Sequence, residues 1–147
     1  LFIGLLMNEF KLEPTPGDFL IRVIMGIDPR VGAMAIGDRV RPGQTVQFHL
    51  RDAQTSAEDL RWALSRYLEE QPSESPRPDP CGALMFACLG RGQGLYGTPH
   101  FDSQQFQELV GNLPLAGFFC NGEIGPVGGT TFLHGYTSCF AIVRPAH

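Results

Sequence analysis

Lysine is nearly absent from this chain, which has a single lysine, Lys11, among 147 residues. The other ten of its 11 basic residues are scattered arginines, and the formal net charge is -4. The chain therefore offers no lysine-rich run or basic helix face that could follow a line of phosphates. Nucleic acid is excluded as an expected partner.

Long apolar runs are also missing, since none approaches the roughly 20 residues that span a bilayer. The apolar residues 1–7 lack the basic flank and the small-residue cleavage site of a signal peptide, and they read as a strand. We expect a soluble protein with no membrane partner. A chain that opens within a strand and without Met is expected to be a fragment of a longer protein.

Cysteine pairs with CxxC spacing do not occur. The four cysteines are Cys81, Cys88, Cys120 and Cys139, and three of them stand within apolar runs. This pattern favours buried, reduced thiols in a cytoplasmic protein over disulfides. We expect no cofactor and no metal.

Apolar and aromatic residues are plentiful, with a hydrophobic fraction of 43% and 11 phenylalanines. One domain of this length can bury a core without disulfide or metal. Residues 71–80 hold four prolines among polar residues, which excludes helix and sheet and predicts an exposed loop. We interpret residues 1–147 as a single domain with a first half, 1–70, and a second half, 81–147.

Apolar patterning and turn residues predict the elements. Strands are expected at residues 1–7, 18–28, 32–36, 44–50, 83–89, 114–120 and 132–143. A capping box that begins at Thr55 predicts a helix over 55–69, and Asp102 as N-cap predicts a helix over 103–110. The continuous apolar run 83–89 is typical of a central strand. The fold class is α+β, with a mixed, largely antiparallel sheet and two main helices in the order ββββ-α-β-α-ββ.

Two glycine-rich loops follow strands 83–89 and 114–120, and they hold the candidate binding residues. A right-handed parallel crossover would place both loops at one sheet edge, where ligands bind in open α/β arrangements. Arg91 and Glu123 could then bind the opposite charges of a zwitterion, or form an ion pair with each other. The candidate ligand-binding residues of these loops are Cys88, Gly90, Arg91, Gly92, Asn121, Gly122, Glu123 and Gly125.

Three other chemistries fit the pattern less well. The GxGxxG match at residues 92–97 is followed by a helix only after residue 101, and the Asp102 carboxylate would repel a pyrophosphate there. A thiol enzyme could use Cys88 with His134 as base and Glu123 as orienting group, but Cys88 lies in an apolar run typical of core. A zinc site drawn from Cys88, Cys120, His100 and His134 lacks short ligand spacing.

Several long strings resemble the FIST C-terminal domain: MFACLGRG at 85–92, LPLAGFFCNGEIGP at 113–126 and FLHGYT at 132–137. Residues 19–22, 26–28 and 43–52 resemble it too, so the likeness covers nearly the whole chain. It implies a sensory, non-enzymatic domain of signal-transduction proteins that binds small ligands such as amino acids. It also implies a preceding N-terminal FIST domain and signalling partner proteins.

His134 joins the candidate ligand-binding residues on this resemblance. A related domain in F-box proteins supplies the alternative function, a protein-interaction adaptor. An exposed apolar patch around Phe118, Phe119 and Phe132 would favour that alternative.

Overall fold

The structure, a computed structural model, describes residues 1–70 and 78–146. Most of the loop predicted at 71–80 lies outside the described residues, and residues 78–80 are in neither helix nor strand. The chain forms two compact units. Unit 1 is Leu1–Arg51 with Ile124–His134, and unit 2 is Asp52–Glu123 with Gly135–His147.

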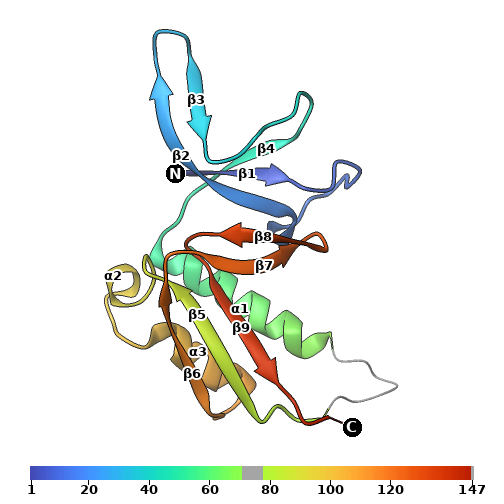
Figure 1. Ribbon diagram of the computed structural model, residues 1–147, viewed down its shortest axis with the longest axis vertical. Coiled ribbons are helices and arrows are strands. Elements are labelled where there is room, and N and C mark those ends of the chain that lie inside the picture. Colours follow the sequence, from blue (N-terminus) through green and yellow to red (C-terminus); the bar gives the residue numbers. More distant parts are fainter. Residues whose placement is uncertain (71–77, 147) are drawn as a thin grey trace. The chain divides into compact units, whose positions relative to one another are not determined.

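Unit 1 is built on a four-stranded sheet in the order β3-β2-β1-β4, with antiparallel neighbours throughout (Figure 1). Its strands are β1 (Phe2–Leu6), β2 (Phe19–Asp28), β3 (Ala33–Ile36) and β4 (Val46–His49), and the 3-10 turn η1 (Pro16–Asp18) precedes β2. The core of unit 1 is small and comes from β1 and the start of β2. Its buried apolar side chains are Ile3, Leu5, Leu6, Phe19 and Leu20.

Unit 1 also contains the hairpin of β7 (Glu123–Val127) and β8 (Thr130–His134), apart from Glu123 itself. Gly128 and Gly129 join the two strands with φ values of 57° and 80°. Positive φ at both central residues is what a two-residue hairpin turn of type I′ needs, and glycine adopts it without steric cost.

Unit 2 contains helices α1 (Ala53–Glu69), α2 (Gln93–Tyr96) and α3 (Phe101–Val110) and a three-stranded sheet in the order β6-β5-β9. The central strand β5 (Gly82–Cys88) is parallel to β6 (Leu115–Cys120) and antiparallel to β9 (Ser138–Val143). Helices α1 and α3 lie behind this sheet in Figure 1 and pack on one of its faces.

The core of unit 2 lies between that sheet face and the two helices. It is formed by Leu60 and Leu64 of α1, Ala83 of β5 and Phe106 of α3. The Phe106 ring stacks on Phe140 of β9 with centroids 5.0 Å apart. Alternate residues of the strands face this core, as the two-residue period of a strand requires.

The predicted fold class is confirmed: the domain is α+β, and antiparallel pairing predominates. The apolar run at 83–89 becomes the central strand β5, as predicted. No helix in the described parts of the chain is long and apolar enough to cross a membrane.

Both helix starts differ from their predictions. Helix α1 begins at Ala53, and its N-cap is Asp52, whose carboxylate accepts from the Thr55 backbone N–H at 2.8 Å. Helix α3 begins at Phe101 after His100, which has a φ of 62°. Asp102 is therefore not the N-cap of α3; its carboxylate is bound elsewhere, to Arg91.

The strand order after α3 was also predicted incompletely. Residues 132–143 form parts of two strands, β8 and β9, instead of one, and the predicted glycine loop at 122–129 contains strand β7. Gly125 and Pro126 made a strand there look unfavourable. In a two-stranded sheet each strand has an unpaired side, so a proline without an N–H group is tolerated.

Candidate functional site

The two predicted loops begin side by side in unit 2. Cys88 at the end of β5 is the register partner of Cys120 at the end of β6, and the strands are parallel. The Leu89 backbone N–H donates to the Cys120 carbonyl at 2.9 Å. Residues that follow both strands therefore leave the sheet at the same edge, as the sequence pattern predicted.

A third segment, residues 135–137, joins the two loops. It precedes β9, which is antiparallel to β5, so it lies at the same end of the sheet. The Cys88 N–H donates to the Thr137 carbonyl at 2.9 Å, and Arg91 Nη1 lies 3.4 Å from the Tyr136 carbonyl. The sequence pattern missed this segment because residues 132–143 looked like one continuous strand.

Arg91 forms a buried ion pair with Asp102. Its Nε donates to Asp102 Oδ2 at 2.7 Å and its Nη2 to Oδ1 at 2.9 Å, which is the bidentate geometry of a strong charge-assisted pair. Arg91 is 8% exposed and Asp102 4%. Arg91 Nη2 also donates to the Tyr96 hydroxyl. The pairing of Arg91 with Glu123 that the sequence allowed is not the one formed.

The pKa values of this cluster follow from burial. Burial raises the pKa of Tyr96 to about 12, because the phenolate would have to form away from water, and Arg91 only partly offsets this. Burial opposes the charge on Arg91, but the hydrogen bonds and the charge of Asp102 outweigh it and raise its pKa. Asp102 is the residue that sequence reasoning missed, because its place at a helix start suggested a cap.

Glu123 connects the second loop to the third segment. It is only 2% exposed, and its Oε2 accepts from the Thr137 N–H at 3.2 Å and from Thr137 Oγ1 at 2.8 Å. Its other oxygen lies 3.4 Å from Cys120 Sγ. Burial, followed by this contact with Glu123, raises the pKa of the Cys120 thiol. Glu123 thus fixes the start of β9 to the end of β6.

The thiols near this site occupy partly or fully buried positions. All four cysteines are free; Cys88 is buried, Cys120 and Cys139 are half-buried and Cys81 is exposed. Burial also raises the pKa of Cys139. A raised pKa lowers the fraction of reactive thiolate near neutral pH.

Asn121 and the loop glycines occupy the more accessible part of the site. Asn121 is exposed, while Gly90 and Gly122 are half-buried. Gly92 has a φ of 70°, and a Cβ there would lie 2.9 Å from the Phe119 ring. Its positive φ favours glycine at this position whether or not a ligand binds.

The two remaining candidates, Gly125 and His134, belong to unit 1. His134 Nε2 lies 2.9 Å from the Gly125 carbonyl oxygen, which fixes the ring within the β7-β8 hairpin. The triad of Cys88, Glu123 and His134 is therefore not contained in either unit by itself. Within residues 1–70 and 78–146, no three His, Cys, Asp or Glu side chains are grouped to hold a metal.

The three segments meet at one end of the unit 2 sheet. Arg91 is paired with Asp102 and Glu123 is hydrogen-bonded to Thr137, whereas the Asn121 amide is exposed as a donor and acceptor.

Known proteins share this chain's sequence over most of its length. The family model of the FIST C domain matches residues 2–126. The uncharacterized protein MT0656 of Mycobacterium tuberculosis (strain CDC 1551 / Oshkosh) is 45% identical over 140 residues, which are 95% of this chain and 35% of that protein. The uncharacterized protein Mb0898c of Mycobacterium bovis is 41% identical over 140 residues, which are likewise 95% of this chain and 35% of that protein.

A plant protein is also similar. The F-box/LRR-repeat protein At5g63520 of Arabidopsis thaliana is 31% identical over 119 residues, which cover 73% of this chain and 22% of that protein. The chain thus spans about a third of the length of the mycobacterial relatives and less of the plant one.

Proposed function

The chain belongs to the FIST C domain family, a family of sensory domains, and on that premise we propose that it binds a small ligand at the ends of β5 and β6. The observation that carries the proposal is the meeting of three segments, 88–92, 120–123 and 135–137, at one end of the unit 2 sheet. Free amino acids are the first ligand class to test, because the Asn121 amide can serve both an ammonium and a carboxylate.

The residues of the site divide into contact and positioning groups. Asn121 is exposed and contacts the ligand directly. Arg91 and Glu123 are buried and bonded to Asp102 and Thr137, so they position the loops around it. Gly125 and His134 contact each other within the β7-β8 hairpin of unit 1.

Calorimetric titration with each free amino acid tests the proposal. We expect at least one to bind, and Asn121→Ala to weaken binding roughly tenfold, the loss of about one charged hydrogen bond. Asn112→Ala is the matched control: Asn112 is also exposed but lies in the loop before β6, at the opposite end of that strand. Equal affinity in the Asn121 and Asn112 variants would remove the site.

A second variant tests the positioning role of Glu123. Glu123→Gln keeps the shape but replaces one carboxylate oxygen by an amide that cannot accept the Thr137 bonds and the Cys120 contact together. We expect weaker binding with an unchanged far-ultraviolet circular dichroism spectrum. Full affinity in this variant would show that Glu123 does not shape the site.

A protein-interaction adaptor is the second candidate function. Phe118 is 62% exposed and Phe119 53%, whereas Phe132 is half-buried. Two of the three residues expected in the patch are therefore well exposed. The plant relative is an F-box/LRR-repeat protein. In that case Phe119→Ala, and not Asn121→Ala, would release a bound partner protein from the purified chain, as quantitative mass spectrometry would show.

The remaining expectations concern the longer protein. The mycobacterial relatives carry the matching segment within chains about three times as long. We propose that an N-terminal FIST domain adjoins this one in the same polypeptide, and that signalling proteins respond to the bound ligand in the cytoplasm. Titration of the longer polypeptide with the same amino acids would show whether that neighbour contributes to affinity.

A further inference from the structure

Strand β6 has an open side. It lies at the edge of the β6-β5-β9 sheet and pairs only with β5 among the described strands, as Figure 1 shows. Four of its six residues, 116–119, are exposed. Phe118 and Phe119 account for most of the exposed apolar side chains there, at 62% and 53%.

The backbone of β6 presents an unused row of hydrogen-bonding groups. The carbonyls of Pro114 and Cys120 accept from the N–H groups of Ala83 and Leu89, so even-numbered residues are directed toward β5. In a strand, alternate residues point their N–H and C=O groups to opposite sides. Leu115, Gly117 and Phe119 are therefore directed away from β5, where no described strand pairs with them.

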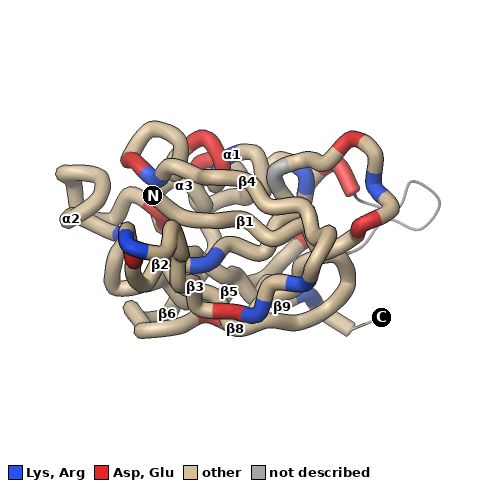
Figure 2. The backbone as a smooth tube through the Cα atoms, turned by 90° about the horizontal axis from the view of Figure 1, so that it is seen from above, with Lys and Arg blue, Asp and Glu red and all other residues tan. Residues whose placement is uncertain are grey.

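None of the usual protections of an edge strand is present on β6. Its sequence, LAGFFC, has no charged residue and no proline, and the tube beside its label is tan in Figure 2. Natural edge strands normally carry lysine, proline or a bulge that prevents pairing with another chain. An apolar edge that lacks them is a template for an added strand.

The sequence of β6 is complementary to itself, and we propose that β6 pairs antiparallel with β6 of a second copy of this chain. A twofold axis at Gly117 brings Ala116 opposite Phe118 of the other copy, and Leu115 opposite Phe119. Each large ring then meets a smaller side chain, and no like charges face each other. Such a contact is closed and uses the same residues in both copies.

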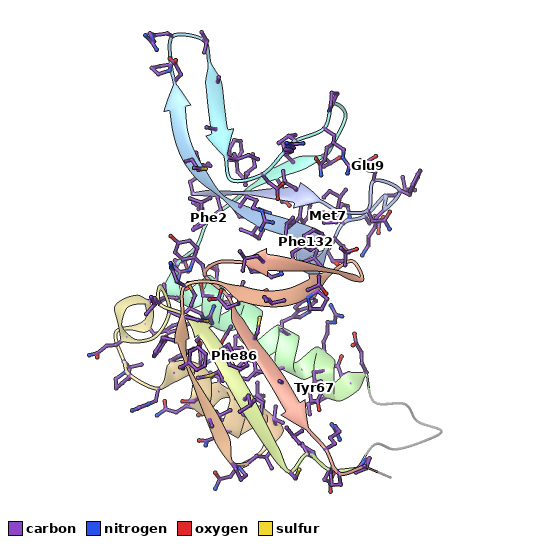
Figure 3. The ribbon with its side chains drawn as sticks, in the orientation of Figure 1. Phe2, Met7, Glu9, Tyr67, Phe86 and Phe132 are labelled. Atoms are coloured by element: carbon purple, nitrogen blue, oxygen red, sulfur yellow. The ribbon has the colours of Figure 1, made fainter. Side chains whose placement is uncertain are left out.

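The side chains already point the right way for this pairing. Leu115 packs against the unit 2 core, so Phe119 shares its helix-covered face. Phe118 lies on the opposite face, where its ring meets Phe86 of β5 with centroids 5.2 Å apart. Phe86 is labelled in Figure 3. Opposed residues of an antiparallel pair share a face, so each of the proposed contacts joins side chains on the same side of the sheet.

The size of the contact sets its strength. A six-residue strand edge is about 20 Å long, and it buries less than the roughly 800 Å² per partner of a standard stable interface. We therefore expect a weak dimer that forms only at high protein concentration.

Sedimentation velocity over concentrations from about 1 to about 300 µM tests the dimer directly. The unmodified chain is expected to shift from monomer to dimer across this range. Phe118→Lys brings one ammonium group from each copy into the contact between the two β6 strands. This variant is expected to remain monomeric. Leu84→Lys is the matched control, because Leu84 is 43% exposed on the same sheet face but belongs to the central strand β5.

Amide hydrogen exchange distinguishes pairing at β6 from a general loss of stability. Amides of Leu115, Gly117 and Phe119 should be protected only at high concentration, while those of Ala116 and Phe118 are protected at every concentration. A chain that stays monomeric at all concentrations would overturn the proposal. So would a Leu84→Lys variant that is as monomeric as Phe118→Lys, because the contact would then lie on the sheet face. Ligand binding enters neither measurement, so the proposal stands apart from the small-ligand function.

Discussion

At the scale of single residues, the burial of Arg91 and Asp102 has a cost that their geometry must offset. Removing two charges from water costs several kcal/mol each, and only good geometry with further hydrogen bonds repays it. Here the pair is bidentate, and the Tyr96 hydroxyl accepts an additional bond. The pair therefore defines how the loop after β5 sits on α3, at the base of the proposed site.

Removing one partner of this pair should be strongly destabilising. In Asp102→Asn the Arg91 guanidinium stays buried without its counter-charge, and we expect a loss of about 3 kcal/mol or more in the free energy of unfolding by urea. Glu70→Gln is the control, because Arg66 and Glu70 form an exposed pair one helical turn apart. That variant should lose no more than about 0.5 kcal/mol. Similar losses in both would mean that the buried pair contributes little.

Tyr96 should make the protein sensitive to alkaline pH. Burial raises the pKa of its hydroxyl to about 12, whereas a tyrosine in the unfolded chain titrates near 10. The unfolded state therefore releases its proton first, and stability falls as the pH rises from about 10 to about 12. Tyr96→Phe should lack this part of the fall. Urea unfolding across that pH range measures it, and parallel curves for the two proteins would contradict the assignment.

At the scale of elements, apolar patterning identified the strands because alternate or successive apolar residues can be recognised from neighbouring positions in the sequence. The run 83–89 is apolar throughout and becomes the central strand β5. The helix starts were displaced because Asp and Thr both cap helices. Asp102 lies within the first turn of α3, and its carboxylate is bound to Arg91. Strand β7 was missed because Gly125 and Pro126 imitate a turn.

The same reasoning applies to the candidate site. The parallel pairing of β5 and β6 could be predicted from two strand and loop patterns that flank one helix. The partners of Arg91 and Glu123 could not, because each is set by a distant residue whose approach depends on packing. Thr137 gave no signal in the sequence, since it stood within an apparent strand.

Gly117 ties two elements together and gives an element-scale prediction. A Cβ at this position would lie 1.8 Å from the Met85 carbonyl oxygen on β5, and backbone atoms cannot move aside cheaply. Gly117→Ala should therefore separate β5 from β6 locally and cost about 1–3 kcal/mol or more in unfolding free energy. Gly26→Ala in β2 meets no atom within 4 Å and should change stability by about 1 kcal/mol at most. A Gly117 variant as stable as the Gly26 variant would disprove the tight packing.

At the scale of the whole molecule, the chain does not divide where its composition changes. Helix α1 precedes the proline-rich residues, yet its Leu60 and Leu64 share a core with Phe106, which follows them. Composition marks a loop but not which elements share a core, because core membership depends on long-range contacts. The backbone passes from one compact unit to the other after Arg51, Glu123 and His134.

This interleaving leads to a prediction about independent folding of unit 2. The backbone leaves unit 2 after Glu123, passes through residues 124–134 of unit 1 and returns to unit 2 at Gly135. The Glu123 carboxylate accepts a hydrogen bond from Thr137 Oγ1 at 2.8 Å. The two residues that flank 124–134, Glu123 and Gly135, therefore lie close together. A fragment of residues 52–147 with 124–134 replaced by about four Gly and Ser residues closes a short loop at little entropic cost. Because unit 2 has its own core, we expect this fragment to fold.

Thermal unfolding followed by circular dichroism, together with the dispersion of amide signals in NMR spectra, measures that outcome. A cooperative transition and dispersed signals are expected for the fragment. The same fragment with Phe106→Ala should lose about 3–5 kcal/mol, because Phe106 is fully buried at the centre of the core. A fragment without a cooperative transition would show that the core around Phe106 is insufficient by itself, and that folding of unit 2 depends on the excised hairpin.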